Sequence, residues 1–227
     1  MKTSIYVSIP TLGSMHPAAV NSFYAHANAA AAGGVRLEIA YTIDDSVIMR
    51  ARSEAVSEFY FRTTHTHYFH ISDDIEICFT PTPEDNIFTR LLSSGNPFVG
   101  ALYSRTAFPQ QCTSVALDGG AVTGVEQGLT PVKYLSGGIW LLKRDVVRKM
   151  VKAYPELEYA SDPDKRRCFA LFLESLVQRP DGTRKLLTED YAFCERWSAL
   201  GGKIYADTSI RTRHYGLHGF QLPTGKG

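Results

Sequence analysis

The first seventy residues alternate between strand-like and helix-like segments. Residues 4–9 and 35–41 are rich in β-branched and aromatic side chains, which is typical of β-strands. Between them, residues 17–34 are rich in alanine and run from a proline to a pair of glycines, and residues 47–62 carry apolar side chains at helical spacing. A third strand is predicted over residues 66–71. This order of elements predicts an α/β fold built on a mostly parallel central sheet flanked by helices.

The remainder of the chain continues this alternation with more turns and a small antiparallel β-hairpin region. The predicted segments are a helix over residues 83–94, a strand over 98–103, a hairpin over 114–125, strands over 132–135 and 139–142, a helix over 145–155, a loop over 155–168, a helix over 188–201 and short strands over 204–205 and 209–212. No internal repeat or linker divides the chain. We therefore expect a single domain over residues 1–227, with halves 1–103 and 104–220 and a tail at 221–227.

Composition places the protein among ordinary globular proteins. Hydrophobic residues make up 44% and charged residues 21% of the chain, which argues against wholesale disorder. The net charge is +1, but residues 1–130 hold 7 Lys and Arg against 12 Asp and Glu, and residues 131–227 hold 17 against 11. The four cysteines form no CxxC pair, which predicts reduced thiols in a cytoplasmic protein. No signal peptide or membrane span is expected.

Two adjacent carboxylates, Asp73 and Asp74, follow the strand predicted at residues 66–71. Ligands bind at the carboxyl ends of strands in open α/β sheets. Two hard oxygen donors at that edge favour Mg²⁺ or Mn²⁺ bridging to a phosphate. An ordinary acidic turn is an equally good interpretation of these residues alone.

Other signals narrow the type of site. The chain has no GxGxxG after its first strand and no GxxxxGK[ST], so the dinucleotide-binding and P-loop hypotheses lose their main support. Gly137 and Gly138 lie between two predicted strands, where the absence of a side chain would let a donor ligand approach, or would simply accommodate a bulge. His65 and His67 face the same side of a strand but lack a third ligand, so we expect no zinc site.

Four blocks in order resemble the nucleotide-sugar-dependent glycosyltransferases of the GT-A fold, and especially the small stand-alone enzymes of phages and large viruses. The blocks are IPT at residues 9–11, MRARSEAV at 49–56, YFHISDDI at 68–75, and LTEDYAFC at 187–194 with GGKI at 201–204 and HYG at 214–216. The resemblance implies a GT-A-like, Rossmann-like fold. It also implies that residues 1–103 bind the nucleotide sugar and that 104–220 form the acceptor side.

The same resemblance implies a metal site within a DxD-like motif. Asp74 keeps the place of the last acid of that motif, and His214 resembles the family's C-terminal metal-binding histidine. Imidazole with carboxylate suits Mn²⁺ somewhat better than Mg²⁺. Ser72 stands where the family has Asp, which puts the strength of metal binding in question, although Asp73 could partly substitute.

The remaining family positions give the expected roles of the other site residues. Asp190 would be the general base of an inverting transfer, and Glu189 would position the acceptor or hold the loop, although acids in a first helical turn are also favoured by the helix dipole. Arg52 would lie near the donor nucleotide, where guanidinium groups suit phosphates. The residues expected around the base and ribose are Pro10, Thr11 and Asp44.

The predicted activity is therefore a metal-dependent hexosyl or pentosyl transfer from a nucleoside diphosphate sugar, such as a UDP-sugar, to a hydroxyl acceptor. Three alternatives stay open. The acceptor could be a hydroxymethylated pyrimidine in viral DNA, which the basic C-terminal half favours and the near-neutral total opposes. The chain could instead be a non-catalytic nucleotide- or sugar-binding module, for which Ser72 is the best support. A nucleotidyltransferase is the weakest alternative, because its usual glycine-rich first loop is missing.

Overall fold

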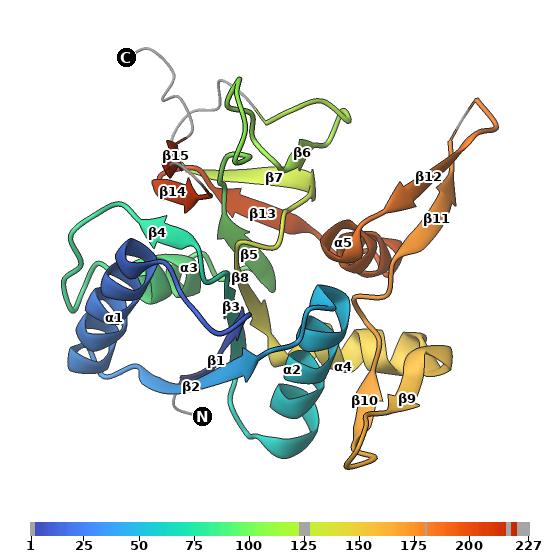
Figure 1. The fold of residues 1–227 in the computed structure, drawn as a ribbon, viewed down its shortest axis with the longest axis horizontal. Helices are drawn as coiled ribbons and strands as arrows, with labels where there is room; N and C mark the ends of the chain where they lie inside the picture. The colour runs from blue at the N-terminus through green and yellow to red at the C-terminus, as the bar shows by residue number, and fades with distance from the viewer. Residues whose placement is uncertain (1–2, 123–127, 180, 217–218, 222–227) are drawn as a thin grey trace.

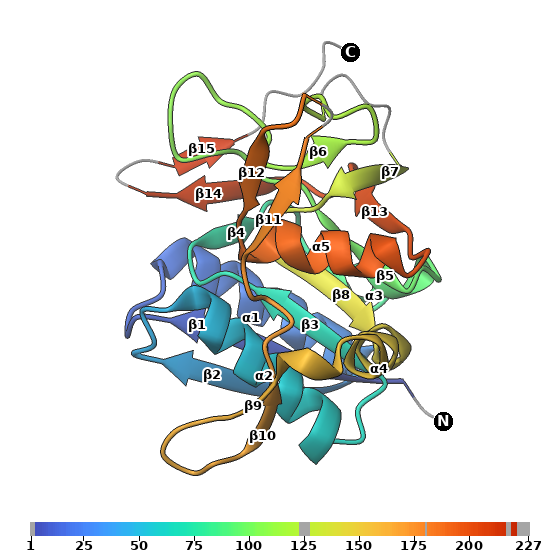
Figure 2. The ribbon, with the colours of Figure 1, turned by 90° about the vertical axis from the view of Figure 1, so that its right-hand side faces the viewer.

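The computed structural model of the protein describes residues 3–122, 128–179, 181–216 and 219–221. An eight-stranded sheet forms its centre, in the order β2-β1-β3-β8-β5-β13-β7-β6, with helices on both faces (Figures 1 and 2). The helices are α1 (Pro17–Ala32), α2 (Ile48–Arg62), α3 (Ile87–Ser93), α4 (Arg144–Ala153), the 3₁₀ turn η1 (Pro155–Leu157) and α5 (Glu189–Ala199). The strands of the central sheet are β1 (Ser4–Thr11), β2 (Arg36–Ile43), β3 (His67–Ile71), β5 (Phe98–Ala101), β6 (Val115–Ala116), β7 (Leu129–Tyr134), β8 (Ile139–Lys143) and β13 (Ile204–Asp207).

The α/β class expected from the sequence is confirmed, but the sheet is mixed rather than mostly parallel. Strand β1 is parallel to β2 and β3, and β13 is parallel to β5. Strand β8 lies antiparallel between β3 and β5, and β7 is antiparallel to β13 and β6. The apolar run that predicted β8 indicates burial on both faces but carries no information about strand direction.

Two hydrophobic cores lie on opposite faces of the sheet, because neighbouring strand residues point to opposite sides. Tyr6 and Tyr68 pack with the apolar faces of α2, α4 and α5 in one core. Val7 and Phe69 pack with α1 and α3 in the other. Trp140 of β8 is fully buried in the first core. Strands β1 and β3 are packed between the two cores, which fixes the position of the sheet edge where both strands end.

Helix ends follow local capping chemistry. The side chain of His16 accepts a hydrogen bond from Ala18 N at the start of α1, and Pro17 occupies the first turn. The helix predicted from residue 83 begins four residues later, at Ile87. Asn86 Oδ1 accepts from the backbone nitrogens of the first turn, while Thr89 accepts from Asn86 N. This capping box stabilises the later start.

Three small antiparallel sheets complete the fold. Strands β4 (Ile75–Ile77), β14 (Thr212–Tyr215) and β15 (Gly219–Gln221) form the first, which lies beside α1 (Figure 2). Strands β9 (Glu158–Ala160) and β10 (Arg167–Phe169) form a hairpin, and β11 (Ser175–Gln178) and β12 (Arg184–Leu187) form another that extends from the body near α5 (Figure 1).

Several local predictions therefore need correction. The segment 155–168, expected to be a loop, contains η1, β9 and the start of β10, and only residues 161–166 lie outside a helix or strand. The strand predicted at 209–212 lies at Thr212–Tyr215. Of the hairpin predicted at 114–125, the structure gives β6 and a bridge between Val115 and Ala121. Residues 123–127 and most of the predicted tail lie outside the described residues.

Two general predictions can be compared with the described part of the chain. All four cysteines are free. Among the helices described, none combines the length and the apolar character needed to cross a membrane.

Candidate functional site

A carboxylate and an imidazole 140 residues apart in sequence meet beside the end of β3. Asp74 lies in the turn between β3 and β4, and His214 lies on β14, where it is paired in register with Ile75 of β4. His214 Nε2 is 3.0 Å from Asp74 Oδ2. Its Nδ1 is 2.8 Å from the carbonyl oxygen of Ser104. The pairing of β4 with β14 thus brings together the two residues expected to bind a metal.

The chemistry of this pair fits a cation site. A carbonyl at Nδ1 orients the ring and directs Nε2 toward Asp74, as in many metal-bound histidines. Burial lowers the pKa of His214, but the hydrogen bond to Asp74, the charge of Asp74 and the hydrogen bond to the Ser104 carbonyl together outweigh burial and raise the pKa above its usual value. The pair therefore favours a positive charge between its two side chains. Within the described ranges, no group of three or more His, Cys, Asp and Glu side chains is arranged to hold a metal.

The ends of β1 and β2 bring the predicted donor-side residues next to Asp73. Burial raises the pKa of the Asp73 carboxyl; the Thr11 hydroxyl lowers it through a hydrogen bond, and the charge of Asp74 raises it further. The backbone oxygen of Thr11 accepts from Asp44 N at 3.1 Å, and Asp44 has a positive φ of 62°. Pro10 lies on β1, one residue before Thr11. Thr11 thus contacts both Asp73 and Asp44, while Pro10 is placed by its neighbour in β1.

A pocket of about 450 Å³ opens beside the Asp73–Asp74 turn. Residues 14–17, just before and at the start of α1, form part of its wall. His16 and Tyr215 stack on each other in this wall, with ring centroids 3.7 Å apart. No motif in the sequence marks His16 as a site residue. Its position depends on a contact with the last part of the chain, for which the local sequence gives no signal.

The backbone of Gly137 takes part in four hydrogen bonds near the Asp74–His214 pair. Its carbonyl oxygen accepts from Arg52 at 2.7 Å, from His70 at 2.9 Å and from Ser72 at 3.2 Å. Its backbone nitrogen donates to Asp190 Oδ2 at 3.0 Å. A Cβ at Gly137 would lie 2.3 Å from the Arg52 guanidinium, so a side chain has no room there.

These contacts give a physical reason for serine at position 72. The Ser72 hydroxyl donates to the Gly137 carbonyl oxygen, and its backbone nitrogen donates to the Gly138 oxygen at 2.9 Å. An ionised carboxylate can only accept hydrogen bonds, so an aspartate here would face the Gly137 oxygen without a proton to share. The departure from the DxD pattern is thus matched to the neighbouring backbone.

The predicted catalytic acids lie at the start of α5 and are both largely buried. Glu189 Oε1 accepts from Arg52 at 2.8 Å, and Arg52 itself is 6% exposed. Burial raises the pKa of Glu189 although the Arg52 charge opposes the shift. Arg52, expected near the donor nucleotide, thus connects α2 to α5 and to Gly137.

Asp190 accepts three hydrogen bonds. The Thr188 hydroxyl donates to Oδ1 at 2.7 Å, and Tyr191 N donates to the same oxygen at 2.8 Å. Gly137 N donates to Oδ2. Thr188 is the N-cap residue of α5, but its hydroxyl donates to Asp190 and accepts no hydrogen bond from the backbone of the first turn. A carboxylate has about four acceptor positions, so Oδ2 keeps room for one more donor.

Tyr103 is near both the Asp74–His214 pair and Asp190. Its ring centroid is 5.0 Å from that of His214, in an edge-to-face arrangement. A Cβ at Gly138 would lie 2.5 Å from the Tyr103 ring and from the Ile75 side chain, so both glycines are tightly packed. Burial and then the charge of Asp190 raise the pKa of Tyr103. The partly buried Tyr103 therefore contacts His214 and faces Gly138, and it lies close enough to Asp74 and Asp190 to feel their charges.

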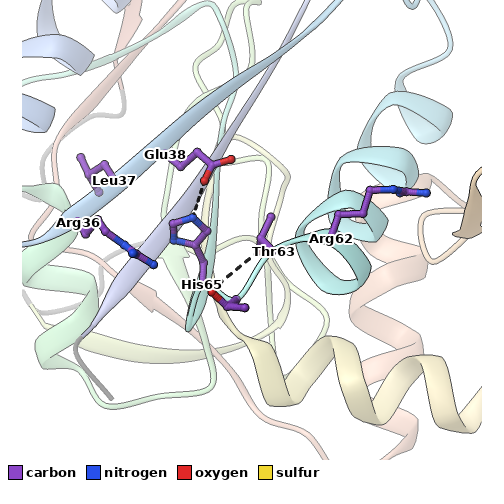
Figure 3. Close-up of a pocket in the computed structure, with 7 residues that line it drawn as sticks. Arg36, Leu37, Glu38, Arg62, Thr63 and His65 are labelled. Atoms are coloured by element: carbon purple, nitrogen blue, oxygen red, sulfur yellow. Dashed lines mark hydrogen bonds and ion pairs between the residues drawn. The ribbon is translucent and has the colours of Figure 1, made fainter.

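His65 and His67, for which no zinc site is expected, lie just before and at the start of β3, at the opposite end of this strand from Asp73 and Asp74. His65 is 2.8 Å from Glu38 Oε2, and both line a pocket of about 460 Å³ at the starts of β2 and β3 (Figure 3). His67 Nδ1 is 2.9 Å from the Thr66 hydroxyl. Two arginines of the basic run at residues 165–167 form ion pairs. Arg166 lies near Glu58, and Arg167 binds Glu158.

No family model and no curated protein matches the sequence. Among solved structures, A197 from STIV is similar with a TM-score of 0.57 and 14% identity, over 95% of this chain and 86% of that one. HddC from Yersinia pseudotuberculosis aligns with a TM-score of 0.35 and 10% identity, over 65% of this chain and 79% of that one. The structure of HddC in complex with GMP-PN aligns with a TM-score of 0.34 and 12% identity, over 87% of this chain and 97% of that one. At this level of identity the likeness concerns the fold alone, and the chain shares its α/β fold with A197 from STIV along nearly its whole length.

Proposed function

We propose that this protein is a metal-dependent glycosyltransferase that moves a sugar from a nucleoside diphosphate sugar to a hydroxyl group. The observation that carries the proposal is the meeting of Asp74 and His214 at 3.0 Å beside the pocket at the end of β3. A carboxylate and an oriented imidazole at the carboxyl edge of an α/β sheet suit Mn²⁺ or Mg²⁺ and a phosphorylated ligand. The resemblance of the sequence blocks supports the same conclusion.

The proposed reaction exchanges one C–O bond for another. The acceptor oxygen forms a bond to the anomeric carbon, while the bond from that carbon to the phosphate oxygen breaks and a nucleoside diphosphate leaves. When bound, the cation would stabilise the negative charge of the leaving diphosphate. Asp74 and His214 would hold the cation, and Asp73, Thr11, Pro10 and Asp44 would line the donor edge.

Asp190 is proposed to accept the proton of the acceptor hydroxyl. Its Oδ2 takes one hydrogen bond, from Gly137 N, and can accept a second. Inverting transfer requires a base on the side of the sugar opposite the leaving group. Glu189 is bound to Arg52 and would keep α5, and with it Asp190, in place. Gly137 and Gly138, expected to leave room for the donor, are instead packed against Arg52, Ile75 and Tyr103, and Gly137 would act by holding Asp190 through its backbone nitrogen.

A donor panel tests the proposal. Purified protein is titrated with UDP-, GDP- and other nucleotide sugars with Mn²⁺, with Mg²⁺ and with a chelator. Calorimetry measures binding, and chromatography measures release of the nucleoside diphosphate. We expect binding and slow donor hydrolysis that require the cation. If no donor binds and none is cleaved in any condition, the proposal is wrong.

A second function is favoured by the contacts of Asp190. Three donors already bind its carboxylate, and a carboxylate bound in this way is also suited to a purely structural role at the start of α5. The protein would then be a nucleotide-sugar-binding module without catalysis. Metal-dependent donor binding, with no turnover when hydroxyl acceptors of glycan and hydroxymethylpyrimidine DNA types are supplied, would support this second function.

A further inference from the structure

Two aromatic rings from distant parts of the chain stack beside the Asp73–Asp74 turn. His16 precedes α1 and Tyr215 ends β14. Their centroids are 3.7 Å apart and their planes differ by 12°. Both residues line the pocket that also contains Asp73 and Asp74. The stack therefore lies at the proposed cation site, although neither ring is among its expected ligands.

The backbones of the two stacked residues hold the turn directly. His16 N donates to the carbonyl oxygen of Asp73 at 3.0 Å. Tyr215 N donates to the carbonyl oxygen of Asp74 at 2.9 Å. Consecutive peptide groups of the turn are thus bound by two different segments, and the ring stack joins those segments to each other.

Each ring is also fixed on its far side. His16 Nδ1 accepts from Ala18 N at 3.3 Å, so the imidazole caps α1. The Tyr215 hydroxyl donates to Glu76 Oε2 on β4 at 2.7 Å. Arg213 donates to the same Glu76 oxygen at 3.0 Å. The stack is therefore a contact between two anchored groups, which lose little rotamer freedom when they meet.

We propose that His16 and Tyr215 form a clasp that holds the Asp73–Asp74 turn in the conformation in which Asp74 meets His214. As the metal-binding role of that pair belongs to the proposed function, the consequence for cation affinity rests on it. A turn held in its binding conformation costs less to order when a cation arrives, so the clasp raises affinity without contacting the ligand. His16 and Tyr215 are positioning residues in this scheme.

Two substitutions at position 16 separate the stack from the helix cap. His16→Asn keeps a side-chain acceptor suited to the N-cap of α1 but removes the ring. His16→Phe keeps an aromatic ring facing Tyr215 but cannot accept from Ala18 N. Tyr215→Phe keeps the stack and removes the hydroxyl that binds Glu76. If the two residues form a clasp, His16→Asn, which loses the ring, has the largest effect. If only the helix cap matters, His16→Phe, which loses the cap, has the largest effect.

Two readouts are measured on the full chain. Titration with Mn²⁺ alone, followed by the electron paramagnetic resonance signal of free Mn²⁺, gives cation affinity. Hydrogen exchange of residues 72–77 in the metal-free protein reports the opening of the turn. We expect His16→Asn to weaken Mn²⁺ binding and speed this exchange about 3- to 10-fold, which corresponds to an aromatic pair. His16→Phe should stay within about 2-fold of the original protein in both.

The two readouts separate failure of the clasp from failure of the proposed function. If His16→Asn matches the original protein in exchange, or His16→Phe is as impaired as His16→Asn, the clasp is refuted. If the original protein binds no Mn²⁺, the proposed function fails, and the exchange rates alone decide on the clasp. Tyr215→Phe should open the turn less than His16→Asn does, and the opposite order also refutes the clasp.

Discussion

His214 Nε2 and Asp74 Oδ2 lie 3.0 Å apart, close enough to share one positive charge. Burial lowers the pKa of His214, whereas the hydrogen bond and the charge of Asp74 raise it, so the carboxylate favours a proton on the imidazole. A divalent cation would compete with that proton, because metal binding needs the neutral imidazole and the ionised carboxylate. The pair therefore offers the most direct tests of the proposed function.

Asp74→Asn should abolish most cation binding. The amide keeps the shape of the side chain but removes its charge, and we expect the affinity for Mn²⁺ to fall at least about tenfold, by analogy with losses around metal sites. Calorimetric titration with Mn²⁺ measures the change. His67→Gln serves as a control, because His67 lies at the other end of β3. Equal affinities in Asp74→Asn and the original protein would remove Asp74 from the site.

Glu189→Gln should destabilise the fold. It leaves the Arg52 guanidinium buried without its carboxylate, and breaking a buried ion pair in this way costs about 3 kcal/mol. Urea unfolding at pH 7 measures the free energy of unfolding. The matched control is Glu158→Gln, which breaks an exposed pair with Arg167 and should cost below about 1 kcal/mol. Similar losses in both variants would contradict the importance assigned to burial.

Ser72→Asp should weaken the protein rather than improve its DxD-like motif. The carboxylate would face the Gly137 oxygen with no proton to donate, at a cost of about 1–3 kcal/mol. Ser72→Ala is the control, since Arg52 and His70 still donate to that oxygen. Thermal and urea unfolding measure both variants. Tighter Mn²⁺ binding by Ser72→Asp without loss of stability would refute this explanation of the serine.

The stability of the protein should fall in mild acid, in part through His26. Burial lowers the pKa of His26 to about 4 from its usual 6.5. Between those values the unfolded chain binds a proton that the folded chain does not, so stability is full above pH 6.5 and is lost toward pH 4. We expect His26→Gln to flatten the slope by up to about 1.4 kcal/mol per pH unit. Urea unfolding at several pH values between 4.5 and 6.5 compares the two proteins, and parallel curves would contradict the prediction.

Asp190→Asn should separate catalysis from binding. If Asp190 is the base, the turnover number falls by at least about 100-fold, while donor affinity stays within about 2-fold. Single-turnover kinetics and donor titration measure the two quantities. A turnover number that survives the change would show that Asp190 serves only to fix the start of α5.

Much of the sheet and part of the site follow from the sequence. The β-branched and aromatic residues of β1 and β3 predict strands, and Asp73–Asp74 follows directly after β3. The direction of β8 does not follow, because burial on both faces is the same for a parallel and an antiparallel neighbour. Strands β9 and β10 span three residues each, which is too short for a periodic apolar pattern to reveal them, although Cys168 and Phe169 are buried.

The parts of the site that could not be predicted depend on contacts between distant segments. Arg52 has the spacing of a helix residue, but its partner Glu189 lies 137 residues away. His16 has the sequence context of a turn, and its stacking partner lies near the other end of the described chain. Local patterns indicate which residues are available at a sheet edge. They do not indicate which of them will meet.

The pairing of β14 with β4 also determines when the site can form during synthesis. The N-terminal strands and the Asp74 carboxylate emerge from the ribosome early, and they can pack before the imidazole of His214 has been made. Only when β14 has emerged and joined β4 do both side chains face one another. A nascent chain therefore carries one half of the pair until β14 has emerged, and the contact between Asp74 and His214 cannot form before then.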